Sequence, residues 1–404
     1  MIPAASASAC PQNLVRRRIH NHGDQVSNNS NSLTSRRIRT FLIGCGEHAS
    51  IVIHTCVSLL EGFEVVGVCD LDPNRAASAS RRFGNCPQYI DPAVMLESCD
   101  AEAAIIVAPP FVHAQLTRQC IEAGLHVFIE KPMFIMPEEL AAVAQAAQAK
   151  PDLNVSVTFN KRYSPYIRQI RSIIAQNEFG APSYFFGKFA GGYRSGATDL
   201  LRVGAIHYFD LARYLFGEIS RISALSHEKQ AGQAHFAVNV QFENGAVGNF
   251  FLSSLGLWSA KGAESLEIRG DRNFVSLVNL RELTWQKPPL AVGQTQSSHQ
   301  SGVEIPSPAQ YLEPNYSNVS RLEYQSYHHN GYYPRLETFV SDLQSGTQTG
   351  PGITDSRRAL EIAIAVEQSA AADGEYVSPH GEERPPRSAA PSIHQPTVSA
   401  HPTE

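Results

Sequence analysis

The sequence has no excess of positive charge, no long apolar run and no closely paired cysteines, and each absence excludes a class of protein. Its 33 Lys and Arg residues are outnumbered by 38 Asp and Glu residues, so it offers no basic field to a nucleic-acid backbone. No apolar stretch approaches the ~18 residues that span a bilayer. The seven cysteines form no CxxC pair, which is typical of reduced thiols in an intracellular chain. We therefore expect no nucleic-acid, membrane or metal partner and a cytoplasmic location.

The two ends of the chain lack the periodic apolar pattern of folded elements. Residues 1–38 are rich in Arg, Ser and Asn, and residues 378–404 are rich in Pro, Ser and His. Such composition predicts a disordered leader and a disordered tail. An Arg- and Ser-rich leader is also compatible with import into an organelle, but it has neither an amphipathic apolar stripe nor a secretory core. We favour an uncleaved flexible leader.

Between the ends, the pattern predicts two domains of different class. From residue 39 to 160, short apolar runs alternate with helical stretches, which is the βαβ pattern of a doubly wound parallel sheet. From 161 to 377 the strands lengthen, and the turn at Glu243-Asn244-Gly245 indicates a hairpin. The fold class is therefore an α/β Rossmann domain followed by an α+β domain. The second domain is expected to hold a large, mostly antiparallel open sheet and to end in a helix before Gly374.

The first expected strand ends in the turn Gly44-Cys45-Gly46-Glu47-His48-Ala49, a G-x-G-x-x-A pattern that opens a helix. Glycines in this turn let the backbone approach a pyrophosphate, whose charge is stabilised by amides at the helix start. We place Gly44, Gly46, Glu47 and His48 in a dinucleotide site. An ordinary strand-end turn is the alternative.

The end of the second expected strand strengthens the dinucleotide interpretation. Asp70 follows that strand, where a carboxylate can bind the hydroxyls of the adenosine ribose. A carboxylate repels a 2'-phosphate, so NAD(H) is favoured over NADP(H). Arg75 lies close enough in the sequence to keep NADP(H) open.

Four further motifs resemble the Gfo/Idh/MocA family of oxidoreductases, and the resemblance covers roughly Arg39 to Val377. The motifs are Glu130-Lys131-Pro132, Pro109-Pro110 followed by His113, the segment FNKRYSP at 159–165, and His207-Tyr208-Phe209-Asp210. The resemblance implies a nicotinamide dinucleotide in the first domain and a sugar, cyclitol or related polyol against the sheet of the second. It adds Pro109, His113, Glu130 and Lys131 to the cofactor site.

The same resemblance implies the catalytic pair. Oxidation of a secondary alcohol needs a base for the hydroxyl proton and a cation near the developing alkoxide. His207 is the expected base and Lys131 the expected stabiliser, and both are expected to contact substrate together with Arg162, Tyr193 and Asp210. The alternatives are an ion pair between Lys131 and Glu130 and a purely structural His207.

One position departs from the family pattern. Members commonly carry Asp four residues before the histidine, whereas this chain has Val203, which cannot orient the imidazole. Asp199, Asp210 or Tyr193 are candidates for that task. We expect an NAD(P)-dependent dehydrogenase or reductase that works as a homo-oligomer, because an open sheet leaves a face to cover. A catalytically weakened sensor or regulator that binds nucleotide and sugar is the alternative.

Overall fold

The computed structural model describes residues 36–98, 101–192, 194–230, 232–256, 262–271, 273–287, 310–312 and 322–381. Most of the expected leader and tail, as well as Tyr193, lies outside the described residues. No helix in the described part of the chain is long and apolar enough to cross a membrane.

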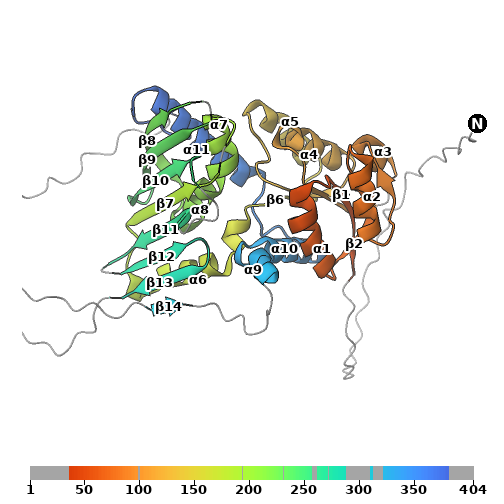
Figure 1. Ribbon diagram of the computed structural model, residues 1–404, viewed down its shortest axis with the longest axis horizontal. Helices are drawn as coiled ribbons and strands as arrows, with labels where there is room; N and C mark the ends of the chain where they lie inside the picture. The colour runs from red at the N-terminus through yellow and green to blue at the C-terminus, as the bar shows by residue number, and fades with distance from the viewer. Residues whose placement is uncertain are drawn as a thin grey trace, which may run out of the picture. The chain divides into compact units, whose positions relative to one another are not determined.

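The first sheet is parallel, with strand order β3-β2-β1-β4-β5-β6 (Figure 1). Its strands are β1 (Ile38–Ile43), β2 (Phe63–Cys69), β3 (Gln88–Tyr89), β4 (Ala103–Ile106), β5 (His126–Ile129) and β6 (Val155–Val157). The central strands are apolar on both faces because helices cover both sides, as Ala103–Ile106 illustrates with four consecutive buried residues. The strand order changes direction between β1 and β4, where such folds bind ligands.

Helices follow nearly every strand of this sheet. They are η1 (Ala49–Ile53, a π-helix), α1 (His54–Leu59), α2 (Pro73–Arg82), α3 (Pro92–Glu97), η2 (Pro110–Val112), α4 (His113–Glu122) and α5 (Glu138–Ala149). Two of them begin with the same local signal, an Asp cap followed by Pro. Asp72 accepts from the amide of Asn74, and Asp91 accepts from the amide of Ala93.

Helix α10 (Tyr332–Ser345) lies far along the chain but completes the core of the first sheet. Its Leu336 and Phe339 are fully buried in one cluster with Leu42 and Phe128, and the Phe128 and Phe339 ring centroids are 5.3 Å apart. Figure 1 shows α10 beside α1. The sequence pattern predicted this segment to be part of the second domain, whereas in the structure its side chains pack in the core of the first sheet.

The second sheet has strand order β14-β13-β12-β11-β7-β10-β9-β8. Its strands are β7 (Tyr184–Ala190), β8 (Ile219–Glu228), β9 (Ala234–Phe242), β10 (Val247–Ser253), β11 (Glu264–Arg269), β12 (Phe274–Val278), β13 (Glu282–Gln286) and β14 (Gln310–Leu312). All neighbours are antiparallel except β7 and β10. Strands β9 and β10 are joined by a hairpin in which Gly245 has φ +93, a conformation that favours glycine. The predicted fold class is confirmed.

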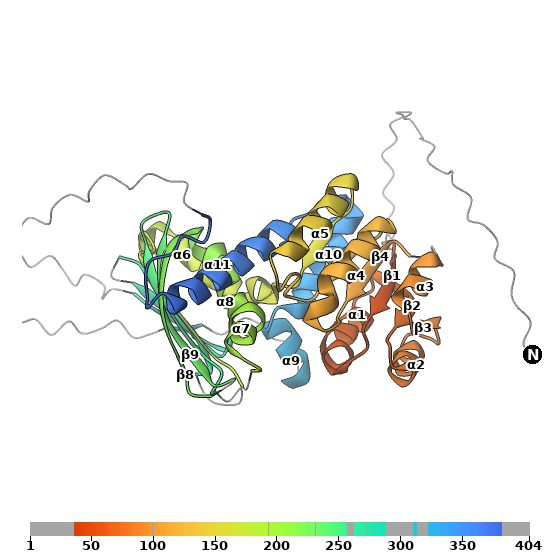
Figure 2. The same cartoon turned by 90° about the horizontal axis from the view of Figure 1, so that it is seen from above.

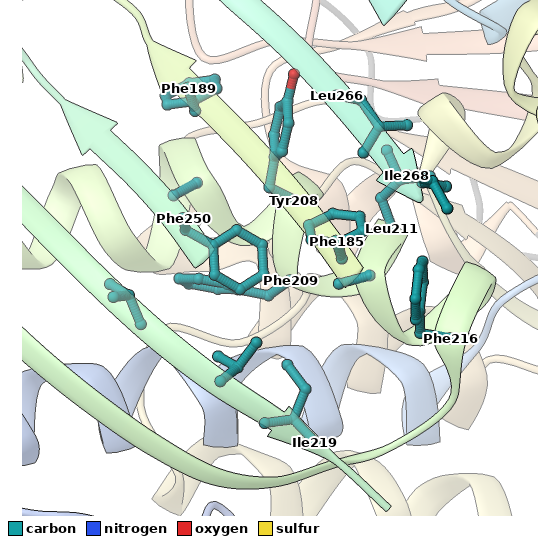
Figure 3. Close-up of a cluster of buried hydrophobic side chains, with 14 of the residues drawn as sticks. Phe185, Phe189, Tyr208, Phe209, Leu211, Phe216, Ile219, Phe250, Leu266 and Ile268 are labelled. Atoms are coloured by element: carbon teal, nitrogen blue, oxygen red, sulfur yellow. The ribbon is translucent and has the colours of Figure 1, made fainter. Parts of the chain in front are cut away.

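Helices lie on one face of this sheet (Figure 2). The helical elements of this half are η3 (Asn160–Tyr163), α6 (Pro165–Ile174), η4 (Asn177–Phe179), α7 (Ala197–Asp199), η5 (Leu200–Ala205, a π-helix), α8 (Ile206–Phe216) and α11 (Ile353–Ala371). Helix α9 (Leu322–His329) instead contacts α10 and α6. Figure 3 shows Phe209 of α8 packed among sheet residues such as Phe185 and Phe250. This core holds the first turn of α8 rigidly, and that turn carries His207.

Candidate active site

A cleft of about 840 Å³ opens at the carboxyl ends of the first sheet's strands. It brings together every residue that the sequence placed in the cofactor site. These residues are Gly44, Gly46, Glu47, His48, Asp70, Arg75, Pro109, His113, Glu130 and Lys131. The cleft lies at the point where the strand order reverses, which is where open α/β sheets bind dinucleotides.

The two turn glycines shape the floor of this cleft. Gly44 has φ +94, and a Cβ there would lie 2.0 Å from the carbonyl oxygen of Val107. Gly46 faces open space, because apart from its chain neighbours no heavy atom of the described residues lies within 4 Å of where its Cβ would be. A pyrophosphate can approach the start of a helix only where the backbone carries no side chain and open space lies beside it. These residues therefore fit a dinucleotide.

Asp70 is fixed by the backbone around it. Its carboxylate accepts from the amide of Cys45 at 2.7 Å and from the amide of Asp72 at 2.9 Å. A carboxylate has about four acceptor positions, so capacity remains for a ribose diol. Arg75 also lines the cleft, and its Nε lies 3.5 Å from the Asp72 carboxylate in an exposed pair.

The surroundings of His113 differ from those expected for a residue that binds the cofactor directly. Its side chain is buried, and its two ring nitrogens each lie 2.7 Å from a carbonyl oxygen, those of Pro132 and Ala108. Both nitrogens therefore face carbonyl oxygens of the protein, and the neutral ring donates a hydrogen bond to one of them. His113 supports the turn that follows Lys131 rather than offering a nitrogen to a ligand.

Glu130 and Lys131 do not pair with each other through their side chains. Glu130 accepts from the backbone amide of Lys131 at 3.1 Å and lies 3.3 Å from Nε2 of His48. The Lys131 ammonium instead donates to the carbonyl oxygen of Val203 at 3.1 Å. Burial lowers the pKa of Lys131 to about 8, although the nearby Glu130 opposes this shift. Lys131 is thus aimed at the second half of the chain.

A second cavity, of about 520 Å³, adjoins the cleft. Its lining includes His207, and Lys131 and Tyr332 line both the cavity and the cleft. The remaining lining residues are Asn160, Lys161, Phe189, Arg194, Gly204, Ala263, Glu264, Asn279, Arg281 and Asn330. Lys131 therefore stands where a ligand in one space would meet a ligand in the other.

His207 is available for proton transfer at this junction. It is 8% exposed, packs edge-on against Phe159, and its Nδ1 has no hydrogen-bond partner among the described residues. Burial and the neighbouring cations Lys131 and Lys161 lower the pKa of His207 well below its usual value. The imidazole is therefore neutral at pH 7 and able to accept a proton.

The residues considered as orienting groups for His207 are engaged elsewhere or lie outside the described residues. Asp199 accepts from the amide and hydroxyl of Ser195. Asp210 is paired with Arg162, and Tyr193 is not described. Val203 contributes its backbone carbonyl, which accepts from Lys131 instead of from the imidazole.

Arg162 and Asp210 do not line the cavity, contrary to the expectation that they bind substrate. Arg162 donates to both oxygens of Asp210, at 2.8 and 2.5 Å, and to Asp355 at 2.7 Å. Asp210 is 1% exposed. The three side chains join η3, α8 and α11, so they form a buried structural cluster that supports the helix carrying His207.

Two family models match the chain. The one described as "Oxidoreductase family, NAD-binding Rossmann fold" matches residues 38–159. The one described as "Oxidoreductase family, C-terminal alpha/beta domain" matches residues 191–378. The chain belongs to the Gfo/Idh/MocA oxidoreductase family. This confirms the prediction of an NAD(P)-dependent oxidoreductase with a nicotinamide dinucleotide as its cofactor.

Several relatives resemble this Gfo/Idh/MocA protein. It is 29% identical to an uncharacterized oxidoreductase of Bacillus subtilis over 231 residues, which cover 53% of this chain and 66% of the relative. It is 24% identical to inositol 2-dehydrogenase of Rhizobium meliloti, over 83% of this chain and 97% of the relative. An Agrobacterium radiobacter oxidoreductase, solved with NAD+, L-tartaric acid and magnesium, has a TM-score of 0.70 at 17% identity and covers 85% of this chain and 99% of its own.

The Gfo/Idh/MocA site also contains residues that sequence reasoning did not assign. The Lys161 ammonium lies 2.6 Å from the Glu264 carboxylate, 103 positions away, and both line the cavity. Lys161 belongs to the FNKRYSP motif, which was a usable signal, whereas Glu264 and Tyr332 sit in segments without a motif. Among the described residues, no group of three or more His, Cys, Asp or Glu is placed to hold a metal ion.

Proposed function

We propose that this protein transfers a hydride between NAD(H) and the secondary alcohol or ketone carbon of a sugar, cyclitol or related polyol. The observation that carries the proposal is the position of Lys131, which lines both the dinucleotide cleft and the cavity that holds His207. A nicotinamide bound in the cleft supplies the hydride acceptor or donor. The inositol 2-dehydrogenase relative supports a polyol as substrate.

Each of the two side chains has a separate task in this proposal. The neutral imidazole of His207 takes the hydroxyl proton of the alcohol as the hydride leaves carbon. The Lys131 ammonium stabilises the negative charge that develops on that oxygen, and the partly closed site strengthens its effect. The carbonyl of Val203 keeps the ammonium in place until substrate arrives.

The test is an assay of the full chain against a panel of substrates, in which turnover is measured by the absorbance of reduced nicotinamide. The panel contains sugars, sugar acids, inositols and nucleotide sugars, each with NAD+ and with NADP+. Turnover of one polyol class supports the proposal. Binding of nucleotide and sugar without any turnover would favour the sensor alternative instead.

A homo-oligomer stays a prediction. It is supported by the exposed apolar residues Leu225, Val247 and Phe251 on the second sheet.

The preference for NAD(H) is expected to depend on Asp70. Asp70→Ala removes the acceptor for the ribose diol and the charge that repels a 2'-phosphate, so NADH binding weakens while NADPH binding improves. The ratio of the two dissociation constants should therefore shrink, as measured by fluorescence titration. Asp91→Ala, which removes a carboxylate from the same cleft, is the matched control and should leave the ratio nearly unchanged. A wild-type protein that prefers NADPH would instead point to Arg75.

The pH dependence should report the charge of Lys131. Because the pKa of Lys131 is lowered to about 8, the stabilising ammonium is present below pH 8 and is lost above it. The kcat for alcohol oxidation is expected to fall about tenfold per pH unit above that value. Lys131→Arg keeps its charge throughout and should remove this alkaline decline. A wild-type rate that rises through pH 8 would identify the neutral amine as the base.

A further inference from the structure

The cavity beside Lys131 and His207 has an unbalanced set of charges. Among the described residues that line it, four carry a cationic side chain, Lys131, Lys161, Arg194 and Arg281, and one carries a carboxylate, Glu264. A neutral polyol needs hydroxyl and amide partners, but it has no use for an excess of positive charge. The cost of gathering cations in a partly enclosed space is offset when a ligand brings an anion.

Only two of the four cations have a carboxylate close by. Lys161 is paired with Glu264 at 2.6 Å, and the pKa of Lys131 responds to the adjacent Glu130. Within the described part of the chain, neither Arg194 nor Arg281 has a carboxylate within ion-pair distance. The excess charge of the cavity therefore resides on these two guanidinium groups.

Arg194 is held at the cavity by its surroundings. Its guanidinium lies over the Phe189 ring, 6.0 Å from the centroid, and a Cβ at Gly204 would come within 3.2 Å of it. Its Nε is shielded from solvent and has no hydrogen-bond partner among the described residues. The positive charge of Arg194 also acts on His207, because Arg194 is one of the cations that lower the pKa of the imidazole. Arg281 is exposed, at the rim.

We propose that the substrate is an anionic sugar derivative whose carboxylate or phosphate pairs with Arg194, while Arg281 at the rim attracts it toward the cavity. The proposal rests on the proposed function and narrows its substrate class. A guanidinium presents a planar fork of N–H donors that matches the oxygens of either group. An exposed cation raises the rate of encounter with an anion, and salt screens this effect.

The experiment compares matched substrates on the full chain with NAD+. Each set contains a neutral sugar or inositol, the corresponding sugar acid, and the corresponding sugar phosphate. An anionic member is expected to have a kcat/KM at least about tenfold above its neutral counterpart, and whether acid or phosphate is preferred identifies the source of the charge. Arg194→Gln should raise KM for that anion by about 10- to 100-fold and leave KM for the neutral sugar unchanged.

Two further variants and one binding measurement keep the result interpretable. Arg171→Gln removes an exposed charge on α6, away from the cavity, and should change neither KM. Arg194→Lys retains the charge and should fall between the wild type and Arg194→Gln. In parallel, the rise in Tm that each sugar produces in the presence of NADH reports binding without turnover.

The possible failures are distinguishable. Equal use of neutral and anionic sugars, with no selective effect of Arg194→Gln, overturns the anionic substrate while the proposed hydride transfer stands. Stabilisation by anionic sugars that Arg194→Gln abolishes, without any turnover, supports the charged ligand and overturns hydride transfer. If no sugar, neutral or anionic, is turned over and no anionic sugar raises the Tm, both the hydride transfer and the anionic substrate are overturned.

Discussion

Replacing His207 with alanine is expected to lower kcat by about 10²- to 10⁴-fold, because the alcohol proton then has no base within the cavity. Lys131→Ala is expected to lower kcat by a similar factor, since the alkoxide loses the ammonium that lines both the cavity and the dinucleotide cleft. Stopped-flow measurement of nicotinamide reduction gives the chemical step directly. NADH affinity, measured by fluorescence, should change little in either variant.

A control is needed because His207 is almost completely buried against Phe159. His207→Gln keeps much of the packing volume but cannot act as a base near neutral pH, so it should be as slow as His207→Ala while retaining the wild-type Tm. If either His207 variant turned over substrate at the wild-type rate, His207 would be a binding or packing residue.

Asp210→Ala is expected to lower the free energy of unfolding by about 3–5 kcal/mol, the usual effect of removing one partner of a buried ion pair. Asp210 is fully buried and takes two hydrogen bonds from Arg162, so its loss leaves that guanidinium with Asp355 alone. Urea denaturation measures the change. Kinetic constants of the folded fraction should stay close to those of the wild type.

The matched control for Asp210→Ala removes an exposed partner of the same kind. Glu122→Ala breaks the surface pair with Arg118 one helical turn away and should cost only about 0.3–0.5 kcal/mol. Asp210→Asn keeps the shape of the side chain and tests whether charge or size matters. If the Asp210→Ala protein had wild-type stability and a raised KM for sugar, Asp210 would be a substrate-binding residue instead of a structural one.

The sequence predicted the fold well because the fold depends on local patterns, and the same patterns explain why the candidate cofactor residues lie together. Alternating strands and helices define the parallel sheet, and a G-x-G turn, a strand-end Asp and the Glu130-Lys131-Pro132 motif each lie at a strand's carboxyl end. Parallel strands present those ends at one edge, so the residues converge without any knowledge of tertiary packing. All of them line one cleft.

The lining of the cavity beside His207 was harder to predict, because contacts between residues far apart in the sequence decide which polar side chains face it. Arg162 and Asp210 belong to recognisable motifs, yet they form hydrogen bonds with each other and do not line the cavity. Lys161 and Glu264 meet only through the packing of η3 beside the second sheet. Sequence reasoning identifies charged residues, but it does not show which of them pair.

The packing of α10 onto the first sheet also constrains how the protein is made. Leu42 and Phe128 are synthesised early, but their buried partners Leu336 and Phe339 emerge from the ribosome only after the entire second sheet. Until then the nucleotide-binding half exposes an apolar surface on which nothing has yet packed, a state that favours aggregation and chaperone binding. A fragment that stops at residue 160 would keep that surface permanently. The half of the chain that binds the nucleotide is therefore not an excisable module, and its folding is completed among the last events of synthesis.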